Sequence, residues 1–252
     1  MDQKNFQYYC NFRRPPGPIN IWNIVNGTIN GKCVKFRIQE ISDDMFDAVI
    51  DHMCTDFIRD EEFFSNFKIN ETRDSYEEIR IFWKEILKCG MSIVAIVDEP
   101  SEQKTPVIAG VNLLFVSVKQ LTDNRTTFKD TFKTKNLSMM VKLMDKIASE
   151  SNWREIYRAD KYLIGFGLSV GSNFRGMSLG GHLLSARHLL SRKYGIPVSV
   201  TLFSASSAIK LAEREGYECL VEKKVTDLLN DEGKFIFNQS KSICFKFMGK
   251  RL

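Results

Sequence analysis

The sequence predicts an α/β fold in which a central mixed, mostly antiparallel twisted sheet of about seven strands is flanked by helices. Short segments of alternating apolar and polar residues are interspersed with longer segments whose apolar residues recur every three or four positions. Apolar residues make up 43% and aromatic residues 12% of the 252 residues, which is enough material for a folded core. The length lies between one large domain and two small ones, and one domain is the expectation.

The first 32 residues differ from the rest because they are polar and rich in Pro, Gly and Asn. We expect an N-terminal arm over residues 1–32 that packs on a single domain formed by residues 33–252. The arm lacks the apolar stretch of a signal peptide, and no uncharged apolar run is as long as a membrane span. A cytoplasmic protein without a membrane partner is therefore expected.

The domain is expected to begin with a strand over residues 33–38, because the sequence CVKFRI alternates between apolar and polar residues. A helix should follow this strand. Ser42 provides a capping hydroxyl, Asp43 and Asp44 provide acids for the first turn, and apolar residues then recur at helical spacing as far as Phe57.

The remaining elements follow from the same two periodicities. Helices are expected over residues 74–88, 138–149, 177–193 and about 206–214. Strands are expected over residues 91–97, 107–118, 162–170 and 198–203, and at the segments YECLVEK and ICFKFM. The strands at 91–97 and 107–118 are separated by a loop with two prolines and are interpreted as antiparallel neighbours.

Charge, cysteine and histidine content restrict the function. The net charge of +5 is small and Lys and Arg are dispersed, which permits a phosphate-bearing ligand but does not favour nucleic acid. The six cysteines form no Cys-x-x-Cys motif and have no close His partner, so we interpret them as reduced thiols. His182 and His188 lie on different faces of one expected helix, so no metal is expected.

A glycine-rich turn joins the strand at 162–170 to the helix at 177–193. A turn that leads into a helix exposes main-chain N–H groups without partners inside the helix, and such groups bind anions. Gly176, Gly180 and Gly181 lack a Cβ, which would let a phosphate approach the main chain. The turn lacks both the Gly-Lys-Ser/Thr ending of a Walker A loop and the glycine spacing of a dinucleotide fingerprint.

Two motifs resemble those of a known superfamily. The segment Arg175-Gly176-Met177-Ser178-Leu179-Gly180 resembles the Gln/Arg-x-x-Gly-x-Gly/Ala sequence with which GCN5-related N-acetyltransferases hold the pyrophosphate of coenzyme A. The segment SASSAIKLAEREGYE is similar to their second signature, a small-residue turn before a short helix that ends at Gly-Phe/Tyr. The expected order of elements over residues 33–248 also resembles this fold, which implies a sheet that splays at the strand before the turn.

Within that superfamily, the segment RIQEISDDMFDAVIDHMCTDFIRDEEFF resembles the insect arylalkylamine N-acetyltransferase-like group, whose pattern closes with Phe-x-x-Asp-Glu-Pro. Glu62 stands where this group has proline, and Ser178 stands where a glycine is usual. The resemblance implies transfer of acetyl from acetyl-CoA to a small primary amine by direct attack in a ternary complex. It implies an arylalkylamine acceptor such as dopamine, serotonin, tryptamine or octopamine. We further expect a monomer.

The same resemblance implies which residues contact coenzyme A. The main chain of Leu168, Ser169 and Val170 would pair with the pantetheine arm, and one N–H of this set would face the thioester oxygen. Lys210 would reach the 3′-phosphate, or it is one more surface lysine. The pyrophosphate would lie on the turn formed by Arg175, Gly176, Met177, Ser178, Leu179, Gly180 and Gly181.

Acetyl transfer also needs a base and an acid. Glu61 matches the glutamate of Asp-Glu-Pro and would be the base, or it belongs to a solvated acidic patch. The tyrosine that serves many acetyltransferases as the acid is replaced by Ala212. Ser204 matches the first of two serines in the insect group, and the second falls at Ala208, beside Ser207. Ser204 or Ser207 would relay a proton to the thiolate, or Ser204 would only cap the next helix.

Several alternatives stay open. Phe63, Phe64 and Phe67 either line a pocket for an aromatic amine or pack in the core. The rival function is an acyl-CoA-binding protein with little or no turnover, which Glu62 and Ala208 would indicate. An acetyltransferase for polyamines or protein amines is a further alternative, because acceptor loops vary most among such enzymes.

Overall fold

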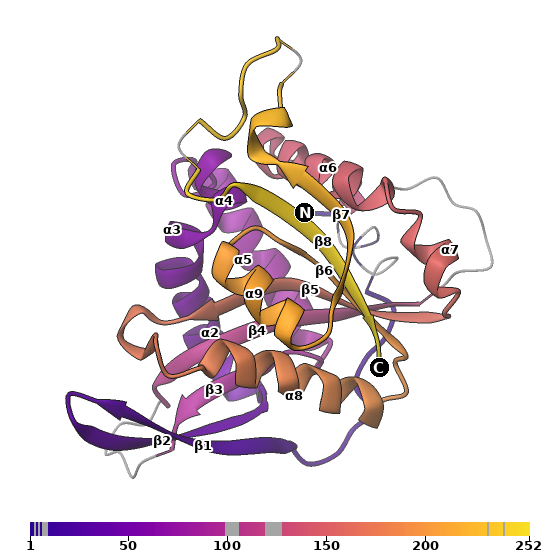
Figure 1. The fold of residues 1–252 in the computed structure, drawn as a ribbon. Coiled ribbons are helices and arrows are strands. Elements are labelled where there is room, and N and C mark those ends of the chain that lie inside the picture. The colour runs from indigo at the N-terminus through magenta and orange to yellow at the C-terminus, as the bar shows by residue number, and fades with distance from the viewer. Residues whose placement is uncertain are drawn as a thin grey trace.

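The structure is a computed structural model that describes residues 1, 2, 4, 6, 10–98, 106–118, 128–230, 232–238 and 240–252. Within these residues, eight strands form one sheet in the order β1-β2-β3-β4-β5-β6-β8-β7 (Figure 1). The strands are β1 (Ile21–Ile29), β2 (Lys32–Glu40), β3 (Ile93–Val97), β4 (Ile108–Val118), β5 (Lys161–Val170), β6 (Val198–Phe203), β7 (Glu218–Lys224) and β8 (Cys244–Arg251). Only β5 and β6 are parallel, which confirms the predicted mixed, mostly antiparallel sheet.

Strand β1 is the one described strand that the sequence did not predict, and it lies inside residues 1–32, the segment predicted as an arm. It pairs with β2 along its whole length at the edge of the sheet. Its pattern is weak in the sequence because it contains Asn and Gly, and because Ile21 and Ile24 are about half exposed. None of the nine residues of β1 is buried, so the strand lacks the clear alternation of apolar and polar residues that a half-buried antiparallel strand shows.

Strands β5 and β6 separate after a short stretch of pairing. The last pair is Gly165 with Thr201, although β5 continues to Val170 and β6 to Phe203. On its other side β5 stays paired with β4 up to Val170, with a bulge at Phe166. The strands therefore form a fork that opens toward the glycine-rich turn, which confirms the splay expected at this strand.

Helices cover both faces of the sheet (Figure 1). Helices α2 (Phe46–His52), α5 (Arg73–Lys88) and α6 (Lys135–Ser149) pack with aromatic residues on one face, where Trp83 and Phe82 are fully buried. Helix α8 (Leu179–Lys193) packs on the other face through Leu179, Leu183 and Leu190. Two further helices are α7 (Trp153–Tyr157) and α9 (Ser206–Arg214). None of the described helices is both long enough and apolar enough to cross a bilayer.

A π-helical turn interrupts the first long helical segment. Helix α2 continues into the π-helical turn η2 (Met53–Phe57), then α3 (Ile58–Asp60) and, after Glu61, α4 (Glu62–Asn66). A wider turn of this kind rotates the side chains that follow it, and such turns are frequent at functional sites. Here it precedes Asp60, Glu61 and Glu62, and Glu61 is the predicted base.

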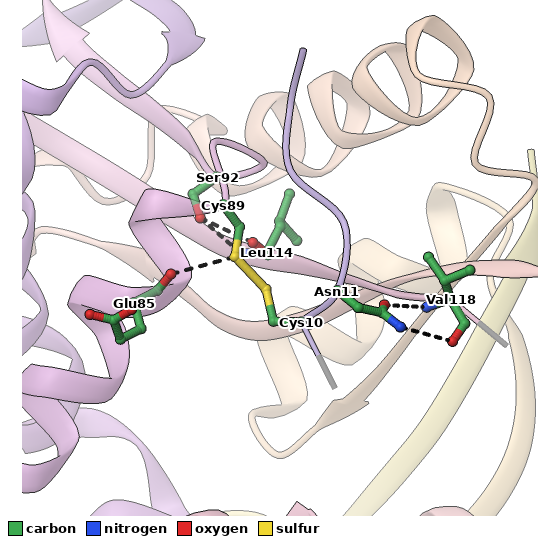
Figure 2. Close-up of a disulfide and its surroundings, with 7 residues drawn as sticks. All are labelled: Cys10, Asn11, Glu85, Cys89, Ser92, Leu114 and Val118. Atoms are coloured by element: carbon green, nitrogen blue, oxygen red, sulfur yellow. Dashed lines mark hydrogen bonds between the residues drawn. A yellow bond between two sulfur atoms is a disulfide. The ribbon is translucent and has the colours of Figure 1, made fainter. Parts of the chain in front are cut away.

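The residues before β1 are held by a buried carboxylate. Glu40 is fully buried in β2, and its two oxygens accept hydrogen bonds from Arg14 Nε at 2.9 Å, Asn20 Nδ2 at 2.8 Å and Tyr194 Oη at 2.7 Å. Asn11 extends the contact, since its side chain pairs with the main chain of Val118 at the end of β4 (Figure 2). The division at residue 32 stays a prediction, and these contacts support a segment that packs on the domain.

The structure corrects the interpretation of the cysteines. Cys10 and Cys89 are joined in a disulfide (Figure 2), so the expectation of reduced thiols was wrong for this pair. The two residues meet because the segment that contains Cys10 runs past the end of α5, where Arg14 N donates to Cys89 O at 2.9 Å. The partners are 79 positions apart, and their spacing carries no signal that the sequence could have shown.

Replacing Glu40 tests how the N-terminal segment is held. Glu40→Ala leaves the Arg14 guanidinium without its buried partner, so the free energy of unfolding should fall by about 3 kcal/mol, measured by urea denaturation. Limited proteolysis should then cut the chain ahead of β1 earlier than in the wild type. Glu71→Ala is the matched control, since among the described residues the Glu71 carboxylate pairs only with Lys68 at the surface, and its loss should change stability little. Equal effects of the two variants would contradict the anchoring role.

Candidate active site

A cavity of about 650 Å³ occupies the fork between β5 and β6. One wall is formed by the segment from Asp56 to Phe64, and the opposite wall by the glycine-rich turn and the start of α9. Residues 165–170 of β5 run between the walls. The predicted catalytic and coenzyme-binding residues that line this cavity are Glu61, Leu168, Ser169, Val170, Arg175, Gly176, Ser178, Leu179, Gly180, Ser204, Ser207 and Lys210.

The glycine-rich turn presents the start of α8 to this cavity. Gly176 has φ +80° and Ser178, the residue before the helix, has φ +58°, so both adopt the left-handed conformation. Ser178 thus stands where glycine would be less strained, in agreement with the glycine that the family has at this position. Its side chain makes no capping hydrogen bond. The first main-chain N–H groups of α8 therefore have no intrahelical partner and can bind an anion.

The glycines of the turn serve different purposes. An added Cβ at Gly176 would meet open space, so this glycine is required by its backbone conformation. At Gly180 an added Cβ would lie 3.1 Å from Leu211 of α9, so this glycine allows close packing of two helices. Met177 points away from the fork, because its side chain lies against Gly27 of β1. Only the main chain of Met177 is therefore suited to contact a phosphate.

Arg175 crosses from the turn to the opposite wall. Its guanidinium forms an ion pair with Asp60, and its Nε donates to Val170 O at 3.3 Å. Hydrogen bonds from Arg59, together with Arg175, hold the pKa of Asp60 at about 2. Lys210 and Arg214 of α9 line the same cavity and add two cations near the start of α8.

Glu61 and Ser204, which are 143 residues apart, are hydrogen-bonded in the cavity wall. Ser204 Oγ donates to Glu61 Oε1 at 2.6 Å, and the other oxygen of Glu61 accepts from Phe64 N at 2.9 Å. Burial raises the pKa of Glu61, and the hydrogen bonds from Ser204 and from the main chain oppose this rise. Ser204 does not cap α9, since Ala205 precedes that helix without a side-chain cap, so the capping alternative was wrong.

The three acids of the run 60–62 have separate surroundings. Asp60 pairs with arginines at the rim, Glu61 lies in the cavity wall, and Glu62 accepts from Lys241 N at 3.0 Å. Glu61 is therefore not part of a solvated acidic patch. Glu62, which replaces the proline of the insect group, fixes the loop before β8 to α4 without displacing Glu61.

The three phenylalanines divide between the alternatives left open by the sequence. Phe64 lines the cavity. Phe63 packs against Phe245 and Phe237 with ring centroids 4.9 and 5.1 Å apart, and Phe67 packs against Phe237 at 6.2 Å. Only Phe64 is therefore placed to contact a ligand in the cavity.

Sequence reasoning missed a second polar group in the wall. His52 Nε2 lies 3.0 Å from Ser169 Oγ, and His52 Nδ1 lies 3.6 Å from Asp56 Oδ2. Burial lowers the pKa of His52, and the nearby Asp56 opposes this. The spacing of His52 and Asp56 by four positions on one helix was a signal that could have been used. The described residues contain no group of three or more side chains suited to hold a metal.

Glu61 makes stability depend on pH in a direction that can be checked. Its folded pKa is raised, so above the unfolded value near ~4.3 the folded protein retains a proton that the unfolded chain has released. The free energy of unfolding should therefore decrease as pH rises through this window and stay lower above it. Glu61→Gln removes this titration. Its free energy of unfolding, measured by urea denaturation, should therefore increase relative to that of the wild type as the pH is raised from 4 to 8. A constant difference across that range would contradict the raised pKa, and Glu71→Gln is the exposed control.

Comparisons with known proteins identify the fold. No protein-family model matches the chain, and no curated protein matches its sequence. An insect protein designated arylalkylamine N-acetyltransferase 7, from the yellow fever mosquito Aedes aegypti, superposes with TM-score 0.82 at 25% identity over 95% of this chain and 98% of its own.

Two further solved structures share the fold. Arylalkylamine N-acetyltransferase 2 from Aedes aegypti matches with TM-score 0.75 at 24% identity, over 86% of this chain and 98% of its own. The Drosophila melanogaster polyamine N-acetyltransferase, which forms N-acetylagmatine, matches with TM-score 0.71 at 12% identity, over 86% of this chain and 100% of its own. The chain therefore has the fold of the GCN5-related N-acetyltransferases and is similar to the insect arylalkylamine N-acetyltransferases.

Proposed function

We propose that this protein transfers acetyl from acetyl-CoA to a small primary arylalkylamine by direct attack in a ternary complex. The observation that carries the proposal is the hydrogen bond between Glu61 and Ser204 in the wall of the cavity that also contains the start of α8. A carboxylate with a raised pKa and an uncapped helix start thus border one space. These are the two groups that an amine and a phosphate-bearing donor require.

The fork is suited to the donor. Beyond Gly165, no strand in the described part of the chain pairs with β5 on the side of β6, so the main chain of Leu168, Ser169 and Val170 is available to the pantetheine arm. The pyrophosphate would then reach the amides at the start of α8, and Lys210 would lie near the 3′-phosphate. An N–H of β5 that faces the thioester oxygen would stabilise the negative charge that develops there.

Glu61 would remove the proton from the acceptor. An alkylammonium cannot attack a carbonyl carbon, so the amine must lose a proton before or during attack. A glutamate with an ordinary pKa is a weak base for this purpose. Burial raises the pKa of Glu61 and so brings it closer to the pKa of the amine. Ser204 holds one carboxylate oxygen in place, and Ser207 lies in the first turn of α9, near the donor.

The acceptor side of the cavity favours an aromatic amine. Phe57, Phe64 and Met144 line it, so a ring can pack against apolar side chains while its amine meets Glu61. The names of the mosquito proteins agree with such a substrate. The name of the Drosophila protein gives polyamines as the alternative, which an acceptor panel would distinguish. A cytoplasmic location and a monomeric state stay predictions.

A turnover assay tests the proposal. Purified protein with acetyl-CoA and a panel of arylalkylamines, polyamines and peptides should release free CoASH fastest with an arylalkylamine. Glu61→Gln should lower kcat by about a hundredfold or more, because the base is lost, while the Kd for coenzyme A in calorimetry stays unchanged. Glu62→Gln is the matched neighbouring control and should retain activity. Binding of coenzyme A without release from any amine would support the acyl-CoA-binding alternative, and absence of binding would overturn both.

The pH dependence tests the pairing of Glu61 with Ser204. Since Ser204 lowers the pKa of Glu61 by hydrogen bonding, Ser204→Ala should raise that pKa. With the same amine, the rising limb of kcat/KM against pH should then move to higher pH. Ser207→Ala has no such bond to lose and should leave the limb in place. If Ser204→Ala lowers kcat without moving the limb, Ser204 acts on the leaving group instead.

A further inference from the structure

Arg187 of α8 is a buried cation whose hydrogen-bond partners are all neutral. It is 1% exposed, although it lines the cavity. Its Nη1 donates to Thr201 Oγ1 at 2.7 Å, and its Nη2 donates to the carbonyl oxygens of Leu163 at 3.2 Å and Val200 at 2.9 Å. Its Nε–H has no partner, and no carboxylate of the described ranges forms an ion pair with it.

The guanidinium lies at the closed end of the fork. Leu163 belongs to β5 and Val200 to β6, so one side chain is bonded to both strands just before their last pair. Gly165 makes room for it, because an added Cβ there would lie 2.6 Å from Nη1. The positive charge thus forms the floor of the space into which the donor would enter.

Neighbouring groups do not neutralise this charge. The ring of Tyr217 lies 5.7 Å from the guanidinium carbon, and its hydroxyl shares a hydrogen bond with Ser199. Burial and neighbouring cations lower the pKa of His188 to about 3, so this residue is neutral, and it lies 3.5 Å from Glu215. Burial also lowers the pKa of Arg187, but a guanidinium stays protonated in proteins. An anion that enters the fork would gain a counterion that is already desolvated.

The reaction produces such an anion and leaves its proton donor unassigned. Ala212 replaces the usual tyrosine, and Ser204 directs its hydrogen to Glu61. We propose that Arg187 stabilises the thiolate of coenzyme A as it leaves, so that sulfur departs as an anion without a general acid; this inference rests on the proposed function. The neutral amine nitrogen bonds to the acetyl carbon, one N–H proton passes to Glu61, and the C–S bond breaks with its electron pair on sulfur. The proton on Glu61 then passes through solvent to the thiolate, which restores the Glu61 carboxylate and gives CoASH.

The first test uses the wild-type protein. Coenzyme A is titrated in complex with the protein while the ultraviolet absorbance of the thiolate is followed. A cation at the fork should lower the pKa of the bound thiol by about one unit or more relative to free coenzyme A. An unchanged or raised thiol pKa would overturn the inference and leave the proposed function standing. Failure of coenzyme A to bind would contradict the proposed function itself.

Three variants separate charge from packing. Arg187→Met removes the charge at similar volume, so the bound thiol should return to the pKa of free coenzyme A, and kcat should fall about tenfold or more with the KM for the amine unchanged. Arg187→Lys keeps a charge and should keep the lowered thiol pKa. Thr201→Val is the matched control, because it removes a hydrogen bond of Arg187 and leaves its charge. Equal thiol pKa values in Thr201→Val and Arg187→Met would mean that Arg187 only holds β5 and β6 together, and would overturn the proposal.

Discussion

The structure depends on the point at which β5 and β6 stop pairing. Up to Gly165 and Thr201 the sheet is continuous, and beyond them two strands diverge with main-chain groups that the other strand no longer satisfies. Buried backbone groups without partners are costly, so a fork of this kind is stable only where water or a ligand can reach it. Helix α8 and the segment 56–64 border the opening, and the cavity is the space between them.

The two walls of this cavity come from distant parts of the chain and carry different chemistry. The wall from α8 and α9 offers unpaired amides and the cations Lys210 and Arg214, whereas the wall after the π-helical turn offers a carboxylate and apolar side chains. The contact between Glu61 and Ser204 joins the walls. Because Glu62 fixes the loop before β8 to α4, replacement of the proline leaves the backbone around Glu61 supported.

The sequence predicted those elements whose periodicity reflects burial. Strand β6 and helix α9 lie where expected, and α5 and α8 differ by one or two residues, because their buried faces impose a clear pattern. Strand β1 was missed because an edge strand lacks that pattern. Arg187 and the pair of His52 with Ser169 were missed because their partners lie on other elements. The disulfide was missed because periodicity says nothing about residues 79 positions apart.

The ion pair between Arg175 and Asp60 places a carboxylate where the negative charge of a bound diphosphate would lie. A diphosphate that reached the turn would find Arg175 already paired, and it would have to displace the Asp60 carboxylate from Arg175. The gain in free energy is then the difference between two ion pairs, and dissolved salt weakens both. Donor affinity should consequently respond less to ionic strength than the number of nearby basic residues suggests, and the Asp60 carboxylate would keep its ion pair with Arg59.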